Sequence, residues 1–313
     1  MATAGCIGFI GMGSMGMAMV KHLLAESLAE EVIVWNRSLE KCDEVRNLGA
    51  SVASSLHDLV SAFVSKRSDA IASSSVHLML TGDEATLSVV KELTNLGLTD
   101  TSIISHASTS PEPTKECAEL CENSGNTFVC APVTGRPPAA LSGQLIIWAS
   151  SNSTSASALR LAEANVLKNM GRSVHTISDS DVTKASAYKL ITNFLLYASG
   201  EMFAETAVML ESNGIERSSL QFFMDELVQG SIFHQYGTRI AKEDYSEGSG
   251  APLRIAVKDL HLIKQMAGGA FTPSLDATVR NMSEAQNREG GNLDWCAIAQ
   301  EVKRQSSEEG NPS

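Results

Sequence analysis

The first half of the chain alternates between short apolar runs and longer segments whose apolar residues recur every three or four positions. Residues 6–10 form a continuous apolar run, which predicts a buried strand. The next apolar residues recur at helical spacing and predict a helix over residues 17–26. The same alternation continues to about residue 178. Further strands are predicted at residues 32–35, 50–52, 76–80, 101–105, 127–131, 143–149 and 173–177, and further helices at residues 39–48, 56–64, 84–93, 156–167 and from Pro111.

This order of elements predicts an α/β fold, a parallel doubly wound sheet of the Rossmann type. Ligands of such sheets bind at the carboxyl ends of the strands, where Thr81 and the pair Ser108 and Thr109 are expected. The pair has a second interpretation, because it can also cap the helix that starts near Pro111. Residues 65–75 are polar and rich in serine, and they predict an exposed loop without an assigned role.

After residue 181 the pattern predicts helices only. Residues 182–212 carry apolar residues close to helical spacing throughout, and Gly214 ends the segment. Residues 305–313 are polar and contain Gly and Pro, which predicts a flexible tail. The expected organisation is therefore a nucleotide-binding domain over residues 1–178, an all-helical domain over residues 179–304 and the tail.

A glycine motif, Gly11-x-Gly13-x-x-Gly16, joins the first strand to the first helix. Gly11 permits a tight turn, Gly13 lets the backbone approach a pyrophosphate, and Gly16 lets the helix pack closely on the strand. The helix N-terminus also offers unpaired N–H groups to phosphates. An ordinary glycine-rich turn is the alternative, but the flanking strand and helix favour a dinucleotide. The residues expected to contact it are Gly11, Met12, Gly13, Ser14, Met15 and Gly16.

The end of the second strand indicates which dinucleotide is bound. NAD-binding sheets of this type carry an acidic residue about 20 residues past the glycines. Here Asn36 takes that position, followed by Arg37, Ser38 and Lys41. A carboxylate would repel a 2′-phosphate, whereas a guanidinium, a hydroxyl and an ammonium bind it. We therefore expect NADP(H) rather than NAD, although Arg37 can also merely start the next helix on the surface.

The composition limits the other classes of function. A chain of 313 residues is long enough for two domains, and 43% apolar with 19% charged residues is typical of globular proteins. No apolar run is long enough to span a membrane, and the start resembles no secretory signal, so a cytoplasmic protein is expected. Six scattered cysteines are interpreted as reduced.

Neither the cysteines nor the histidines have the spacing of a metal site, so no metal is expected. His106 is interpreted as structural. The net charge of −12 argues against nucleic acid as a partner but allows a small anionic substrate.

Several motifs in one order resemble the β-hydroxyacid dehydrogenase family, relatives of 6-phosphogluconate dehydrogenase. They lie at residues 8–16, 34–38, 131–135, 143–145, 189–193, 258–260 and 293–295, so the resemblance covers nearly the whole chain. It is nearest to NADPH-dependent glyoxylate/succinic semialdehyde reductases. The resemblance implies that the long helix joins the sheet domain to an all-helical domain, with the active site in the cleft between them. It also implies a homodimer or homotetramer through the helical domain.

The family pattern implies roles for individual residues. Lys189 matches the catalytic acid/base, and Asn193, four residues later on the same helix face, matches a residue that binds or orients the substrate. Delivery of hydride to a carbonyl leaves charge on oxygen, and an ammonium supplies both a proton and positive charge. If Lys189 lies in a partly buried site near Lys258, the pKa of its ammonium would be lowered. Thr134 and Gly135 match a pair that holds the substrate carboxylate. The remaining implied cofactor contacts are Leu80, Thr81, Ser108 and Lys258, and the implied substrate contacts are Ser108, Thr134, Gly135, Lys189, Asn193, Lys258 and Asp259.

The implied activity is NADPH-dependent reduction of a small aldehyde- or keto-acid, with Lys189 as proton donor. Departures from the family pattern leave the substrate open: Thr134 replaces a usual serine, Arg136 stands where Gly or Ser is common, and Ala251 replaces an aromatic residue. A 3-hydroxyacid dehydrogenase working in the oxidative direction is one alternative. An imine reductase, which carries Asp or Tyr in place of the lysine, is another, because Tyr188 is adjacent. A non-catalytic NADP-binding protein is the third.

Overall fold

A computed structural model describes residues 4–66, 74–248 and 251–309, and the chain divides into two compact units, Met1–Lys189 and Leu190–Ser313. The division falls inside helix α9 (Thr183–Ser212), later than the boundary expected after residue 178. Within the described residues, no helix is long and apolar enough to cross a membrane.

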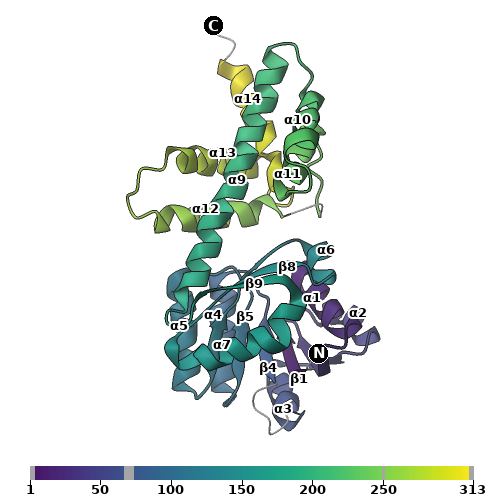
Figure 1. The fold of residues 1–313 in the computed structure, drawn as a ribbon, viewed down its shortest axis with the longest axis vertical. Coiled ribbons are helices and arrows are strands. Elements are labelled where there is room, and N and C mark those ends of the chain that lie inside the picture. The colour runs from purple at the N-terminus through teal and green to yellow at the C-terminus, as the bar shows by residue number, and fades with distance from the viewer. Residues whose placement is uncertain (1–3, 67–73, 249–250, 310–313) are drawn as a thin grey trace. The chain divides into compact units, whose positions relative to one another are not determined.

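The first unit alternates strands and helices (Figure 1). Its strands are β1 (Ala4–Ile10), β2 (Ala29–Trp35), β3 (Ser51–Val52), β4 (Ser75–Leu78), β5 (Ser102–Ser105), β6 (Thr127–Cys130), β7 (Val133–Thr134), β8 (Leu145–Ser151) and β9 (Gly171–Ser178). Its helices are α1 (Ser14–Ala25), α2 (Asp43–Asn47), α3 (Leu56–Lys66), α4 (Asp83–Asn95), α5 (Pro111–Asn123), α6 (Pro137–Leu141), α7 (Ala156–Ala162) and α8 (Lys168–Met170).

All nine strands form one sheet in the order β3-β2-β1-β4-β5-β6-β8-β7, with β9 paired to β8. The strands from β3 to β6 are parallel, which confirms the predicted doubly wound fold. The sheet departs from the parallel arrangement at β8, which runs antiparallel to β6 and β7. The connection between β7 and β8, residues 135–144, holds only the short α6 and is shorter than a parallel crossover needs.

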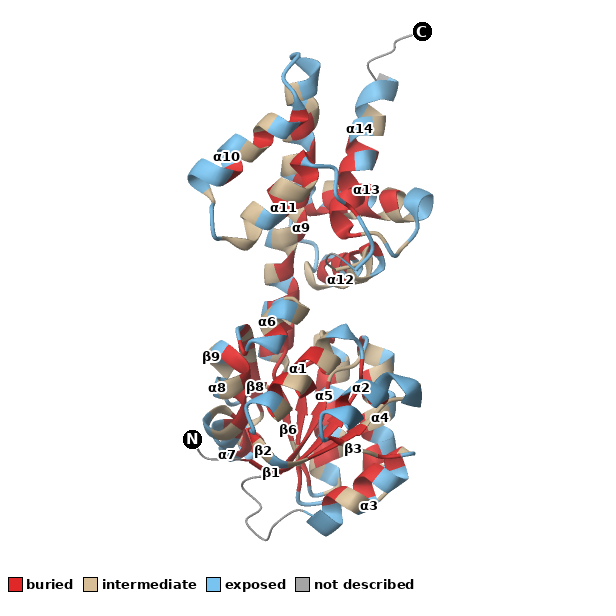
Figure 2. Cartoon of the chain, turned by 90° about the vertical axis from the view of Figure 1, so that its right-hand side faces the viewer, coloured by how far each residue is buried: buried red, intermediate tan, exposed pale blue. Residues whose placement is uncertain are grey.

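The sheet is buried on both faces, as Figure 2 shows by the buried strands beneath helices whose outer sides are exposed. Every residue of β1 is buried, and its side chains alternate between two cores. Ile7 packs in a core with residues of α1 and α7, whereas Ile10 packs in a second core with residues of α3, α4 and α5. Because both faces are covered, the strand reads as a continuous apolar run rather than as an alternating one.

Some predicted boundaries differ from the observed ones. The helix predicted at residues 39–48 is a 3-10 turn, Leu39–Cys42, followed by the short α2, and the helix predicted at residues 156–167 changes to a π-helical segment at Glu163–Leu167. Of the predicted loop at residues 65–75, the first two residues lie in α3 and the last begins β4, while residues 67–73 lie outside the described residues.

In the part of the second unit that the structure describes, helices are the regular elements (Figure 1). They are the continuation of α9, a 3-10 turn at Arg217–Ser219, α10 (Leu220–Leu227), α11 (Ile232–Ala241), α12 (Leu253–Met266), α13 (Pro273–Glu289), a 3-10 turn at Trp295–Ala297 and α14 (Ile298–Glu309). This confirms the predicted helical region. The expected tail at residues 305–313 is helical up to Glu309, and residues 310–313 lie outside the described residues.

Trp295 is the largest fully buried side chain of the core of the second unit. Its ring meets the Tyr197 ring edge-on, with centroids 5.5 Å apart, and lies 4.3 Å from the Tyr236 centroid. A Cβ atom on Gly200 of α9 would lie 2.3 Å from the Trp295 ring. The missing side chain in the middle of α9 therefore makes the space that Trp295 occupies.

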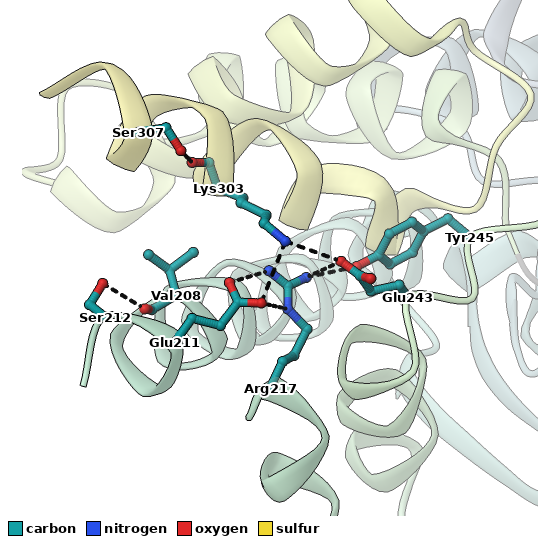
Figure 3. A network of polar contacts seen from close by, with 8 residues as sticks. All are labelled: Val208, Glu211, Ser212, Arg217, Glu243, Tyr245, Lys303 and Ser307. Atoms are coloured by element: carbon teal, nitrogen blue, oxygen red, sulfur yellow. Dashed lines mark hydrogen bonds and ion pairs between the residues drawn. The ribbon is translucent and has the colours of Figure 1, made fainter. Parts of the chain in front are cut away.

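A buried arginine holds several segments of the second unit together (Figure 3). Arg217, after α9, donates from Nε and Nη2 to both oxygens of Glu211 at 3.1 and 3.0 Å. Its Nη1 lies 3.2 Å from a Glu243 oxygen and donates to the Tyr245 hydroxyl at 3.4 Å, and Lys303 of α14 pairs with the same two glutamates. The paired charges explain how a guanidinium can be buried here, so this network is structural.

All six cysteines are buried, and none forms a disulfide: Cys6, Cys42, Cys117, Cys121, Cys130 and Cys296. Burial raises the pKa of the Cys6 thiol to about 11 and those of Cys117 and Cys130 to about 12. These thiols are therefore held in their neutral form at physiological pH.

Candidate active site

The three glycines of the turn between β1 and α1 differ in what surrounds them. Gly11 has φ +105°, and a Cβ there would lie 2.3 Å from the Met79 carbonyl oxygen. A Cβ on Gly16 would lie 1.9 Å from the Gly11 carbonyl oxygen. Gly13 is exposed, and a Cβ there would meet nothing within 4 Å. Internal packing thus accounts for Gly11 and Gly16, whereas no packing within the protein accounts for Gly13.

Replacement of Gly13 by alanine should therefore separate cofactor binding from stability. Because Gly13 has φ −71° and ψ 179°, alanine fits there without strain, and we expect an unchanged thermal midpoint. The added methyl group would occupy the space open to a pyrophosphate, so we expect the Kd for NADPH to rise by roughly tenfold or more. Fluorescence titration and thermal melting measure the two quantities. Gly16→Ala is the contrasting variant and should lower the midpoint, and a Gly13→Ala protein with normal NADPH affinity would contradict the assignment.

The loop after β2 adjoins the glycine turn. The Asn36 side chain accepts a hydrogen bond from the Met12 backbone N–H at 2.9 Å and donates one to the Ser38 carbonyl oxygen at 2.9 Å. Its amide thus braces the two loops against each other. Arg37 and Lys41 are exposed, and in the described part of the chain neither side chain makes a hydrogen bond or ion pair. Two cations therefore stand beside the turn, with the half-buried Ser38 between them.

The ends of β4 and β5 carry the other residues expected at the cofactor. The Leu80 side chain lies beside the turn, because a Cβ on Gly11 would be 3.1 Å from its Cδ2 atom. Thr81 is exposed and Ser108 is half-buried. The alternative role of Ser108 and Thr109 as helix caps is wrong, because the N-cap of α5 is Ser110 and no side chain caps it. The Thr109 hydroxyl bonds that of Thr114 instead, at 2.8 Å.

His106 has both ring nitrogens bonded inside the sheet. Its Nδ1 lies 3.0 Å from the Ala131 carbonyl oxygen, and its Nε2 lies 2.9 Å from Nδ1 of His77, whose Nε2 lies 2.9 Å from the Ser75 hydroxyl. Burial lowers the pKa of His106 to about 4 and that of His77 well below its ordinary value, with the neighbouring His106 adding to the latter effect. Both rings are therefore neutral at physiological pH, as suits a structural chain of hydrogen bonds.

Lys189 and Thr134 are brought together in the first unit, although 55 residues separate them. Lys189 lies in the second turn of α9 and is only 7% exposed, and its Nζ donates to the Thr134 Oγ1 at 3.0 Å. Thr134 lies in β7, opposite Ile146 of β8. The Trp148 indole Nε1 also donates to the Thr134 Oγ1, at 2.9 Å. A buried ammonium and an indole N–H thus both donate to one hydroxyl oxygen.

The loop after Thr134 is shaped by its glycine. Gly135 has φ +147°, and a Cβ there would lie 2.7 Å from the Leu145 side chain, so a larger residue would be strained. Arg136 follows at the N-cap of α6 and is half-buried, and Pro137 takes the first helical position. The unusual arginine and prolines of this loop therefore start a short helix.

Asn193, Lys258 and Asp259 lie in the second unit. Asp259 of α12 is 2% exposed, and its Oδ2 accepts hydrogen bonds from the Asn193 amide at 3.3 Å and from the Tyr197 hydroxyl at 3.0 Å. The Lys258 Nζ lies 3.1 Å from Asp259 Oδ1. Burial and the neighbouring Asp259 carboxylate raise the pKa of Tyr197 well above its ordinary value, so the phenol stays protonated and donates. Asp259 is thus engaged by three side chains of the protein.

Two residues of these clusters escaped the sequence analysis, Trp148 and Tyr197. Trp148 reads as one apolar residue of a buried strand, and its indole N–H becomes relevant only when β7 folds against β8. Tyr197 lies two turns beyond Lys189, so helical spacing could have placed it on the same face as Asn193. Among the described residues, no group of three or more His, Cys, Asp or Glu side chains could hold a metal ion.

Comparison with known proteins gives one family model, described as the NAD binding domain of 6-phosphogluconate dehydrogenase, which matches residues 6–179. An uncharacterised oxidoreductase of Bacillus subtilis is 26% identical, and the aligned region covers 95% of this chain and 99% of the relative. The glyoxylate/succinic semialdehyde reductase 1 of Arabidopsis thaliana is 28% identical, and the aligned region covers 95% of this chain and 98% of the relative.

A solved structure shares the fold over nearly the same length. The 3-hydroxyisobutyrate dehydrogenase of Mycobacterium tuberculosis, determined with L-serine, superposes with a TM-score of 0.79 over 96% of this chain and 100% of its own. At 20% identity this likeness shows the fold alone.

Proposed function

Because the chain belongs to the β-hydroxyacid dehydrogenase family, the 6-phosphogluconate dehydrogenase-like oxidoreductases that act on CH–OH groups with a nicotinamide cofactor, we propose that it reduces a small aldehyde- or keto-acid with NADPH. The observation that carries this proposal is the 3.0 Å hydrogen bond from the buried Lys189 ammonium to the Thr134 hydroxyl. This hydrogen bond supports the proposal because it brings the proposed proton donor, Lys189, next to the hydroxyl proposed to bind the substrate carboxylate, that of Thr134. The glyoxylate/succinic semialdehyde type of substrate is the one we favour.

The residues of the glycine turn fit a dinucleotide. Gly13 leaves space where a side chain would otherwise project, and α1 begins at the next residue, so its unpaired N–H groups suit a pyrophosphate. Met12, Ser14 and Met15 would contribute the surrounding contacts, as would Leu80, Thr81 and Ser108 at the neighbouring strand ends. When bound, the cofactor supplies the hydride.

Arg37, Ser38 and Lys41 would select the phosphorylated form of the cofactor. Arg37→Ala removes a guanidinium from the 2′-phosphate, and we expect the Kd for NADPH to rise by roughly tenfold or more while the Kd for NADH stays within about twofold. Fluorescence titration with both cofactors measures this selectivity. Arg172→Ala, at another exposed arginine of the same unit, is the control. Equal losses for the two cofactors would contradict an NADP-selecting role.

The protein groups handle the substrate as follows. Thr134 and Gly135 bind its carboxylate through the hydroxyl and the backbone N–H, and Lys258 adds positive charge. The Lys189 ammonium donates its proton to the carbonyl oxygen as charge develops there. Asn193, one helical turn further along α9, orients the substrate. Asp259 acts through Asn193, because its carboxylate is buried and accepts the Asn193 amide.

An assay of NADPH oxidation tests the proposal. The purified protein is offered glyoxylate, succinic semialdehyde, other short semialdehydes and cyclic imines, and loss of absorbance at the nicotinamide band measures turnover. Turnover of the acids supports the proposal. Turnover of cyclic imines alone would favour an imine reductase, and binding of NADPH without any turnover would favour a non-catalytic NADP-binding protein. In a parallel assay with NADP⁺, a gain of absorbance with 3-hydroxyisobutyrate and no turnover of the other compounds would favour a dehydrogenase working in the oxidative direction.

We also propose that the protein is a homo-oligomer of the cytoplasm. On α9 an exposed apolar row, Ile191, Leu195, Met202 and Met209, recurs at helical spacing, which is unusual for a solvated face. Light scattering after size exclusion measures the oligomeric state. The six cysteines form no disulfide, which fits a reducing compartment.

A further inference from the structure

Trp148 has no assigned part in the proposed reaction, yet its indole N–H reaches the hydroxyl proposed to bind the substrate. A threonine hydroxyl has two acceptor lone pairs and one hydrogen to donate. Both of its partners here, the Lys189 ammonium at 3.0 Å and the Trp148 indole at 2.9 Å, can only donate. Thr134 must therefore accept both bonds, which occupies both lone pairs. Its own hydrogen is left to donate, and within the described residues of the first unit the Thr134 hydroxyl makes no hydrogen bond beyond these two.

The indole is held in place on several sides. Its ring stacks on the His175 ring of β9, with centroids 5.1 Å apart and planes 24° apart, and meets the Tyr188 ring with centroids 4.8 Å apart. The Trp148 backbone N–H donates to the Pro132 carbonyl oxygen at 3.1 Å. Because β7 pairs with β8 in a fixed register, Thr134 lies opposite Ile146, and Trp148 lies two residues further along the same face. The indole N–H is therefore preorganised toward Thr134.

We propose that Trp148 is a positioning residue that makes the Thr134 hydroxyl an obligate hydrogen-bond donor to the substrate carboxylate. This inference rests on the proposed function and extends it to the choice of substrate class. A carboxylate oxygen only accepts hydrogen bonds, so it matches a hydroxyl whose lone pairs are both taken. An iminium N–H only donates and finds no free lone pair there. The arrangement therefore favours anionic acids over imines at this hydroxyl.

Trp148→Phe tests the inference, because phenylalanine keeps a ring between His175 and Tyr188 but lacks the N–H. With one lone pair released, the hydroxyl can rotate away from the carboxylate. We expect the KM for glyoxylate and succinic semialdehyde to rise about three- to tenfold, with kcat changed less than about twofold. The KM for butanal, which lacks a carboxylate, should not change. His175→Phe, which keeps the stacking and the indole, should match the wild type.

A double-mutant cycle with Thr134→Val separates hydrogen bonding from packing. In the valine background, Trp148→Phe should have no further effect on KM, since no hydroxyl remains to be oriented. An equal effect in both backgrounds, an unchanged KM for the acids, or an equal rise for butanal would overturn the inference. Calorimetric binding of succinate to the NADP⁺ complex gives a readout without turnover. If the wild type reduced no acid but bound succinate more tightly than Trp148→Phe does, the proposed function would be refuted and the inference would be retained.

Discussion

Replacement of Lys189 by alanine should lower kcat for the reduction of glyoxylate by about a hundred- to ten-thousand-fold, the usual contribution of a general acid. The reason is that the substrate oxygen would lose both its proton source and the positive charge that stabilises it. The Kd for NADPH should stay within about twofold, because the glycine turn and Arg37 are untouched. Stopped-flow measurement of NADPH oxidation in a single turnover separates this chemical step from product release.

Lys184 of the same helix provides the matched control. It is exposed and pairs with Asp181 at 3.1 Å, so Lys184→Ala removes an ammonium from α9 without touching Thr134. We expect normal turnover from this variant. If Lys189→Ala kept the wild-type kcat, the proton would have to come from another group, and the adjacent Tyr188 would be the next to test.

The second large effect concerns stability and comes from Glu201, a buried carboxyl of α9. Glu201 is 6% exposed; its Oε1 accepts from the Asn281 amide, but its Oε2 has no partner among the described residues. Burial raises the pKa of Glu201 from 4.5 to about 7, with the neighbouring Glu205 adding to the rise, while Asn281 and Arg280 oppose it. At about 1.36 kcal/mol per pKa unit, this corresponds to about 3 kcal/mol.

The direction of the pH dependence follows from proton binding. Between about pH 4.5 and 7 the folded state keeps a proton on Glu201 that the unfolded state has lost. The contribution of Glu201 to stability is therefore complete below about pH 4.5 and is lost as the pH rises through about 7. Glu201→Gln, which keeps an acceptor for Asn281 but cannot ionise, should be more stable than the wild type by up to about 3 kcal/mol at pH 8 and nearly equal to it at pH 4.5.

Urea unfolding followed by tryptophan fluorescence at several pH values measures this difference. Glu205→Gln, at an exposed carboxylate one turn away on α9, is the control and should shift stability by less than about 0.5 kcal/mol. A Glu201→Gln protein whose stability tracks the wild type at every pH would show that Glu201 is ionised in the folded state without penalty.

The sequence predicts the sheet and its cofactor turn well because both depend on local chemistry. Gly11, Gly13 and Gly16 lie in the predicted strand–turn–helix context, and the structure gives Gly11 and Gly16 separate geometric reasons. The apolar run of β1 likewise follows from a strand covered on both faces. The direction of β8 could not be predicted in this way, because it depends on how a short connection folds back across the sheet.

In the candidate site too, some features follow from local sequence patterns and others depend on the tertiary fold. The sequence indicates Lys189 and Thr134 through the family pattern, but their hydrogen bond depends on the tertiary fold. Asn36 is expected at the cofactor, and its amide also joins its own loop to the backbone at Met12, a contact that no local pattern reveals. Trp148 could not be distinguished from a core residue, because a pattern of apolar positions does not show where an indole N–H points.

The burial of all six cysteines has a practical consequence. Maleimide reagents need an accessible thiolate, and the folded protein offers none of its own. A pair of introduced cysteines, at the exposed Glu92 of the first unit and the exposed Asn287 of the second, would therefore carry fluorophores without removal of any native residue. Energy transfer between such dyes would report how the distance between the units responds to NADPH.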